Sequence, residues 1–297
     1  MNKEMIESIH KTVLLNETIE GLNLKDGSIV LDATFGGGGH SKKILEKYPN
    51  AKIVAYDQDK GVWEKAKSKF KGLEKRISFV NSNFRDLDEK ESFDGIIFDL
   101  GLSSDQLENS GRGFSFMKDE PLLMTMKENP GSEDLTARDI VNTWDEKNLA
   151  DIIYGYGEER FSRKIAKAIV DARKKQKIET TFDLVKIIDS SVPGSYRRGR
   201  LHFATKTFQA LRIAVNDELG SLQIGLEKGF NVLKKGGSMS VISFHSLEDR
   251  IVKRFYKEKQ KEGLAILINK KPIIPKEEEI KNNGRSRSAK LRILSRL

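Results

Sequence analysis

Four consecutive glycines, Gly36–Gly39, constrain the fold of this chain more than any other feature. They follow a short apolar run, Ser28–Asp32, and precede a helix-like segment, Ser41–Lys47. Glycine tolerates positive φ and leaves no Cβ between the backbone and a ligand. The start of a helix offers N–H groups that have no partner within the helix. The pattern therefore predicts a strand, a tight turn and a helix start that hold a nucleotide-like cofactor.

An acidic residue at the end of the next apolar run supports this interpretation. Lys52–Asp57 predicts a second strand, and Asp57 stands 21 positions after Gly36. Folds that bind nucleotides place an acid for the ribose hydroxyls about 20 residues after the glycine turn. The run is not a complete dinucleotide fingerprint, because Ser41 occupies the position of the third glycine. This departure disfavours an NAD(P)-binding protein, which stays open as an alternative.

The first hundred residues alternate strand and helix patterns. Two further strands are predicted at Arg76–Val80 and Asp94–Leu100. Strands that are apolar throughout indicate a parallel sheet buried on both faces, so the predicted fold class is α/β, Rossmann-like, with a mostly parallel sheet. Asp99 ends the fourth strand, at the carboxyl edge where open α/β sheets bind ligands. A capping role for Asp99 is the alternative.

The alternation stops after Ser103 and resumes near residue 205. We therefore predict an α/β domain in two parts, residues 1–104 and 205–297, around a helical insertion of residues 105–204. Ser246–Lys259 is predicted as a helix with Ser246 as its N-cap. The polar stretch Lys276–Lys290 is predicted to be mobile. Further predicted elements are helices at Glu158–Lys177, Thr181–Val192, Phe208–Leu219 and Ser221–Leu233, a strand at Ser238–Phe244, and an antiparallel pair formed by Leu264–Asn269 and Leu291–Leu294.

Composition sets outer limits on the function. The 297 residues carry a net charge of +9, which favours a polyanionic partner, although a well-solvated lysine-rich surface explains the charge equally well. There is no cysteine, and four histidines argue against a multi-histidine metal site, so no metal is expected. No apolar run reaches the roughly 18 residues that a membrane span needs. Met1–Lys11 lacks the apolar core of a signal peptide, so a cytoplasmic location is expected.

Seven motifs follow one another in a fixed order along the chain. They are His10–Glu17, Phe35–Ser41, Asp99–Ser104, Gly111–Phe116, Tyr156–Phe161, Thr207–Ile213 and Ser243–Arg250. With this series the chain resembles one bacterial family, the 16S ribosomal RNA cytidine N4-methyltransferases, from about His10 to the C-terminal end of the sequence.

This resemblance implies a fold, a reaction and a cofactor site. The fold is that of class I S-adenosylmethionine-dependent methyltransferases with an inserted helical subdomain for substrate recognition. The reaction is methyl transfer from S-adenosylmethionine to the N4 atom of a cytidine in the decoding region of 16S ribosomal RNA, free or in the small subunit. Asp57 would bind the ribose and Phe84 would lie by the adenine. The implied cofactor contacts are Gly38, Gly39, His40, Asp57, Phe84, Asp99 and Gln106.

The residue that takes the proton from the amine is not assigned by the sequence. Many amino-methyltransferases use an Asp/Asn-Pro-Pro-aromatic motif, and Asp99–Leu102 lacks the prolines and the aromatic residue. Asp99 and His245 are candidates. Arg112, Phe114 and Arg160 are predicted to hold RNA. Neither a membrane nor DNA is an expected partner, and a monomer and a homodimer both remain open. Other candidate functions are methylation of another RNA or a small molecule, and RNA binding without catalysis.

Overall fold

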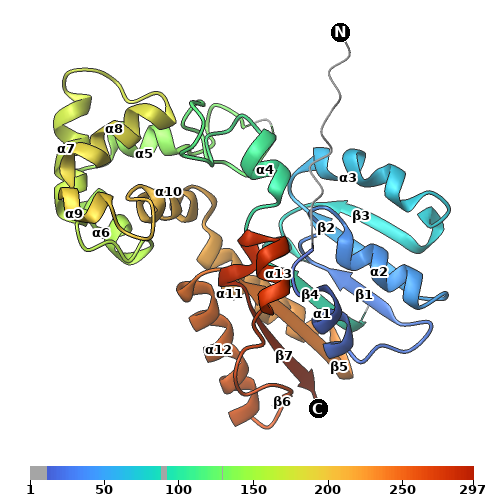
Figure 1. The fold of residues 1–297 in the computed structure, drawn as a ribbon. Helices are drawn as coiled ribbons and strands as arrows, with labels where there is room; N and C mark the ends of the chain where they lie inside the picture. The colour runs from blue at the N-terminus through green and yellow to red at the C-terminus, as the bar shows by residue number, and fades with distance from the viewer. Residues whose placement is uncertain (1–11, 88–91, 129) are drawn as a thin grey trace. The chain divides into compact units, whose positions relative to one another are not determined.

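The computed structural model describes residues 12–87, 92–128 and 130–297. These form two compact units (Figure 1): unit 1 combines Met1–Ser103 with Leu219–Leu297, and unit 2 is Ser104–Glu218. His10 and Lys11 of the first family motif lie outside the described residues. Within the described ranges, no helix combines the length and apolar character that crossing a membrane requires.

A seven-stranded sheet forms the centre of unit 1, with the strand order β3-β2-β1-β4-β5-β7-β6. The first five strands pair in parallel, and β7 lies antiparallel between β5 and β6. The α/β fold class, the mostly parallel sheet and the antiparallel pair at the C-terminal end are thereby confirmed. The bounds are β1 Ile29–Asp32, β2 Lys52–Asp57, β3 Ile77–Asn81, β4 Phe93–Asp99, β5 Leu233–Ser243, β6 Ala265–Leu267 and β7 Lys290–Arg296.

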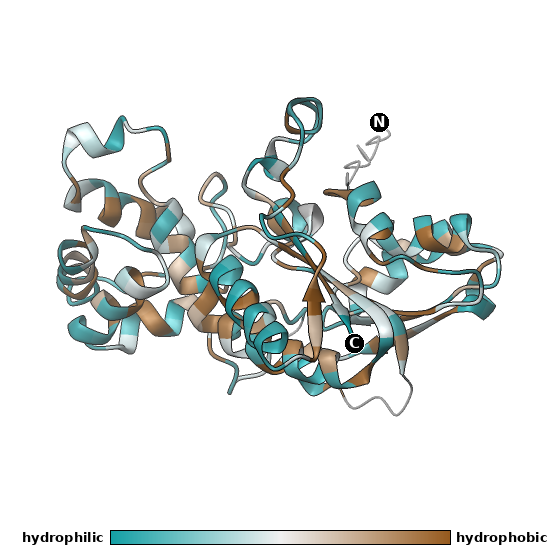
Figure 2. Cartoon of the chain, turned by 90° about the horizontal axis from the view of Figure 1, so that it is seen from below, coloured by the Kyte–Doolittle hydropathy of each residue, from teal (hydrophilic) through white to brown (hydrophobic). Residues whose placement is uncertain are grey.

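Helices cover both faces of this sheet. Val30 and Leu31 are neighbours in β1 and fully buried, yet they enter two different apolar clusters, one on each face. One cluster includes residues of α11 and α12, and the other residues of α1 and α2. Figure 2 shows apolar colour on the strands and mixed colour along the helices, as burial of one helix face requires. The helices are α1 Leu15–Gly21, α2 Gly39–Lys47, α3 Lys60–Ala66, α11 Glu218–Val232, α12 Ser246–Lys261 and α13 Glu277–Asn282, with 3-10 turns η1 Lys67–Phe70, η2 Glu74–Arg76, η3 Phe84–Asp86 and η4 Gly284–Ser288.

The stretch Lys276–Lys290 was predicted to be mobile, and this prediction is wrong. It forms α13 and η4 and is fixed by a distant segment, since Glu279 Oε1 accepts the backbone N–H of Leu14 at 2.8 Å. This contact joins residues 265 positions apart, so the local sequence carries no sign of it.

Unit 2 is helical, and its described residues contain no strand longer than the isolated bridge between Pro121 and Thr180. α7 is shorter than the predicted helix Glu158–Lys177, because Glu158 has a φ of +50° and breaks the helix before Ser162. The prediction assigned everything after Thr205 to the α/β domain, whereas α10 packs against α5 and α6 and belongs to unit 2. The helices are α4 Ser104–Asn109, α5 Ala137–Thr143, α6 Glu146–Gly155, α7 Ser162–Arg173, α8 Thr181–Ser191, α9 Gly194–Arg197 and α10 Thr205–Asn216.

A largely buried ion pair joins α12 to β7. Arg292 Nε lies 2.7 Å from Asp249 Oδ1, and Arg292 Nη2 lies 3.3 Å from Asp249 Oδ2. Burial raises the pKa of Asp249, but the hydrogen bond and charge of Arg292 outweigh it, so the pKa lies below its usual value. Lys290 is a second, more exposed partner at 3.5 Å.

We predict that Arg292→Met destabilises unit 1 by about 1–3 kcal/mol at pH 7, because the Asp249 charge loses its main partner. A lowered pKa contributes stability above the unfolded pKa of about 4 and loses it as the pH falls. The difference between variant and wild type, measured by urea unfolding, should therefore shrink in acid. The double variant Asp249→Asn/Arg292→Met also removes the charge of Asp249 and should regain part of the lost stability. Equal stability of Arg292→Met and wild type at pH 7 would contradict this.

Candidate active site

Three carboxylates meet at one edge of the sheet because the strands that carry them are parallel neighbours. Asp32, Asp57 and Asp99 are the last residues of β1, β2 and β4. The order β2-β1-β4 places β1 between the other two strands. The carboxyl edge of an open α/β sheet is where ligands bind. The sequence predicted Asp57 and Asp99 at this edge, but it did not single out Asp32.

Asp57 holds the glycine turn. Its Oδ2 accepts the backbone N–H of Gly36 at 2.9 Å, and its Oδ1 accepts the N–H of Asp59 at 2.9 Å. The spacing of 21 residues thus corresponds to a direct hydrogen bond. Burial raises the pKa of Asp57 to about 6. Each carboxylate oxygen has a second lone pair, so both can still accept ribose hydroxyls.

Asp32 fixes the other side of the turn. Its Oδ2 accepts the hydroxyl of Ser41 at 2.6 Å, and its Oδ1 accepts the N–H of Thr34 at 3.3 Å. Thr34 Oγ1 in turn accepts the N–H of Asp99 at 2.6 Å. Ser41, the residue in place of the third glycine, therefore ties α2 to the end of β1.

Gly38 and Gly39 have steric reasons to be glycine. Gly38 caps α2 with a φ of +71°, and a Cβ there would lie 2.6 Å from the ring of Phe35. A Cβ on Gly39 would lie 1.8 Å from Thr12 Oγ1. No side chain caps the N-terminus of α2, so this helix presents backbone donors beside the acidic edge. A cofactor with both acceptor and hydroxyl groups fits this set of donors and carboxylates.

His40 and Asp99 lie side by side at this edge. His40 Nδ1 is 3.7 Å from Asp99 Oδ2, and His40 is 4% exposed. Asp99 Oδ1 is buried and has no hydrogen-bond partner among the described residues. Burial, followed by the charges of Asp32 and Glu248, raises the pKa of Asp99 to about 8. An acceptor oxygen held without a partner is suited to receive a hydrogen bond from a ligand.

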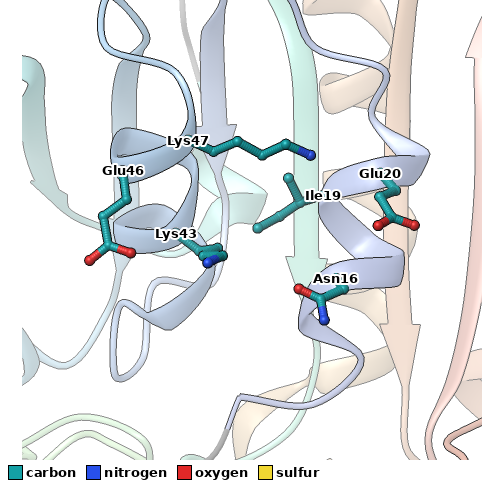
Figure 3. A pocket seen from close by; sticks show the side chains of 6 residues that line it. All are labelled: Asn16, Ile19, Glu20, Lys43, Glu46 and Lys47. Atoms are coloured by element: carbon teal, nitrogen blue, oxygen red, sulfur yellow. The ribbon is translucent and has the colours of Figure 1, made fainter.

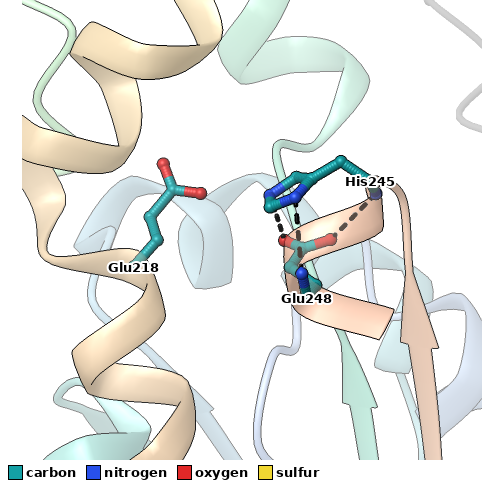
Figure 4. A group of neighbouring side chains, drawn as sticks. All are labelled: Glu218, His245 and Glu248. Carbon is teal, nitrogen blue, oxygen red and sulfur yellow. Dashed lines mark hydrogen bonds and ion pairs between the residues drawn. The ribbon is translucent and has the colours of Figure 1, made fainter. Parts of the chain in front are cut away.

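His245 is occupied as a helix cap (Figure 4). Its Nδ1 accepts the N–H of Glu248 at 3.4 Å, and Glu248 Oε2 accepts the N–H groups of Phe244 and His245. The N-cap of α12 is therefore His245, with Glu248 completing the capping box, and the predicted N-cap Ser246 is wrong by one residue. His245 Nε2 lies 3.2 Å from Glu248 Oε1, so both ring nitrogens face groups of Glu248.

The remaining predicted cofactor residues lie elsewhere. Phe84 opens η3 after β3, packs edge-on against Phe98 at 5.4 Å and lies against Gly225 of α11. It is partly exposed, so it belongs to the core and still borders the surface. Gln106 lies in α4 and belongs to unit 2. Both assignments to the cofactor stay predictions.

Two residues predicted to hold RNA are structural. Arg112 is 7% exposed, donates from Nη1 to the carbonyl of Met126 at 2.8 Å, and lies over the ring of Phe114. Phe114 is 6% exposed. Both predictions are therefore wrong, since these side chains fix the loop 111–126 within unit 2. Arg160 is exposed, as an RNA contact requires.

A separate pocket lies between α1 and α2 (Figure 3). It includes none of the predicted site residues and mixes two lysines with two glutamates. Its lining residues are Asn16, Ile19, Glu20, Lys43, Glu46 and Lys47.

We predict that Asp99→Asn stabilises the protein at pH 8–9, on the order of 1–3 kcal/mol, and leaves it unchanged near pH 4. A carboxyl whose pKa is raised to about 8 costs no stability below its unfolded pKa of about 4, and the cost grows as the pH rises from there to about 8. Asparagine has no charge to bury. Urea unfolding across this pH range measures the effect, with the exposed Asp151→Asn as the control. A constant difference between variant and wild type would refute the burial of an ionisable Asp99.

Comparison with known proteins places the whole chain in one family. A model of the MraW methylase family matches residues 7–297. Ribosomal RNA small subunit methyltransferase H of Nostoc punctiforme is 48% identical, over 100% of this chain and 97% of its own length. Proteins of the same name from a Sulfurihydrogenibium species and from Lactobacillus johnsonii are 47% and 45% identical, each over 97% of this chain and 99% of its own length. The sheet, with β7 antiparallel between β5 and β6, has the class I methyltransferase order that the resemblance implied. The chain is a methyltransferase and belongs to the MraW methylase family.

Proposed function

We propose that this chain methylates the exocyclic N4 atom of a cytidine in the decoding region of 16S ribosomal RNA, with S-adenosylmethionine as the methyl donor. The observation that carries the proposal is the identity of 45–48% over almost the full length of relatives named ribosomal RNA small subunit methyltransferase H. The acidic edge beside the glycine turn supports it. A cytoplasmic location, where ribosomal subunits reside, accompanies the proposal.

The residues of unit 1 fit S-adenosylmethionine, the methyl donor. S-adenosylmethionine supplies an electrophilic methyl group on a sulfonium, and in-line displacement makes catalysis largely a matter of positioning. Asp57 would accept the ribose hydroxyls, Phe84 would contact the adenine, and Gly38, Gly39 and His40 would border the rest. The resemblance also implies a cofactor contact for Gln106. A positive charge bound beside Asp99 would lower the pKa of this carboxyl and favour its ionised form.

We assign to Asp99 the role of accepting the proton that the cytidine amine loses. The exocyclic amine of cytosine is a weak nucleophile because its lone pair is delocalised into the ring, and the amine must lose a proton when the new N–C bond forms. Asp99 Oδ1 has no other hydrogen-bond partner among the described residues, so it can accept that proton. His245 is disfavoured because its Nδ1 already accepts the N–H of Glu248.

Incubation with methyl-labelled S-adenosylmethionine and small ribosomal subunits that lack the modification tests the function. We expect label in N4-methylcytidine after nucleoside analysis. With Asp99 as acceptor and S-adenosylmethionine saturating, kcat/KM for the RNA should rise with pH and level off below about 8, because the bound positive charge lowers the pKa of Asp99. Asp99→Asn should lower kcat roughly 10²–10⁴-fold and abolish this rise. Label in another RNA or a small molecule would support the alternative substrate. If the protein binds S-adenosylmethionine but transfers no methyl group to any RNA, the proposed RNA methylation is refuted.

The ribose assignment has its own test. We predict that Asp57→Ala weakens S-adenosylmethionine binding at least about tenfold, and Asp57→Asn less, because an amide oxygen still accepts one hydrogen bond. Calorimetric titration measures the affinity, and circular dichroism checks the fold. Because Asp57 also holds Gly36, adenosine is compared with 2′,3′-dideoxyadenosine. Their affinity ratio should fall toward one in the Asn variant, and an unchanged ratio would exclude contact between Asp57 and the ribose.

A further inference from the structure

We propose that residues 196–203 of unit 2, with Arg160 beside them, form a surface that binds single-stranded RNA through its phosphates and one unpaired base. The surface, called here the 196–203 segment, runs from the end of α9 to the start of α10. This inference rests on the proposed function and names the part of the chain that contacts its RNA substrate.

The segment offers positive charge that is not neutralised within unit 2. Arg197, Arg198 and Arg200 are all exposed. Arg197 pairs with Asp189 at 3.0 Å, whereas Arg198 and Arg200 have no acidic partner among the described residues. Arginine presents a planar set of donors that matches phosphate oxygens. Two exposed guanidinium groups within three residues therefore favour a polyanionic partner.

An aromatic stack follows the arginines. The ring of His202 is parallel to that of Phe116, with centroids 4.4 Å apart and an interplanar angle of 4°, and it stacks on Phe203 at 4.2 Å. Burial lowers the pKa of His202, so the ring is neutral at pH 7. Its Nδ1 accepts the N–H of Ala204 at 3.3 Å. Phe208 of α10 packs edge-on against Phe116 at 5.6 Å and supports the stack.

The other end of the segment is held by a buried carboxylate. Glu159 is fully buried and accepts the N–H of Phe161 at 2.8 Å and the hydroxyl of Tyr196. The guanidinium of Arg160 lies 4.8 Å from the ring centroid of Phe161 and 5.2 Å from that of Tyr196. These contacts orient an exposed arginine on two rings, so it is preorganised rather than free to rotate.

Charge and rings together favour RNA as the partner. Proteins bind single-stranded nucleic acid with a basic track for the backbone and aromatic side chains on which bases stack. Enzymes that modify a base also need it outside a base stack. The arginines supply the basic track, and the stacked rings of Phe116, His202 and Phe203 supply the aromatic platform.

The arginines are tested with two variants of equal charge. Arg198→Ala/Arg200→Ala should weaken binding to an unmodified decoding-region RNA at least about tenfold at moderate salt and should reduce the salt dependence of binding by roughly two phosphate contacts. The control Lys175→Ala/Lys177→Ala removes two exposed lysines at the end of α7 and should change binding far less. Equal losses of RNA affinity in both variants would show that only the net charge matters, and would overturn the proposal.

The ring is tested with His202→Ala and His202→Phe. We expect the alanine variant to lose roughly five- to hundredfold in RNA affinity and the phenylalanine variant to retain most of it, since only the latter keeps the stack. Equal losses would overturn the stacking role.

Different outcomes test the proposed function and the proposed RNA-binding surface. A wild-type protein that methylates no RNA would refute the function itself. A wild type that methylates the subunit while Arg198→Ala/Arg200→Ala keeps the same KM would refute only the surface. If Arg198→Ala/Arg200→Ala binds naked RNA as the wild type does but binds whole subunits more weakly, the surface contacts a protein, which would also overturn the proposal. Affinity for S-adenosylmethionine should be equal in all variants.

Discussion

The hydrogen bond between the Asp57 carboxylate and the Gly36 amide is the interaction on which the rest of the site depends. It closes the turn after β1 with a residue from the end of β2, so the position of the glycine turn is set by the pairing of two strands. Asp32 and Thr34 then connect the same turn to α2 and to Asp99. A local distortion of β2 would therefore displace the turn, the start of α2 and the carboxyl end of β4 together.

Asp99 shows how a reactive group opposes stability. Two other carboxylates, Asp32 and Glu248, disfavour its charge, and burial does so more strongly. These acids are kept in place for other reasons, since Asp32 holds Ser41 and Glu248 caps α12. The protein thus raises the basicity of one oxygen with residues that already serve the fold. This arrangement destabilises the ionised apoprotein and prepares an acceptor for a proton.

Sequence patterns predicted the parts of this protein that depend on local order. The bounds of β2 agree with the prediction, and Asp57, which the spacing singled out, lies beside the glycine turn through its hydrogen bond to Gly36. The N-cap of α12 was wrong by one residue, because histidine and glutamate form a capping box as well as serine and aspartate do. The hydrogen bond that holds 276–288 comes from Leu14, and the ring of His202 stacks on Phe116, so neither contact is visible in a local window.

The insertion has a consequence for the order in which the chain folds. β4 and β5 pair in parallel at the centre of the sheet, yet unit 2 separates them in the sequence. β7, at the C-terminal end, fits between β5 and β6, which precede it. A nascent chain therefore exposes the apolar edge of β4 while all of unit 2 is synthesised. The sheet is complete only when β7 has been made and has inserted between β5 and β6. Such non-local pairing slows folding and prolongs exposure to aggregation. The sheet is thus completed late, by a strand that follows both of its neighbours in the sequence.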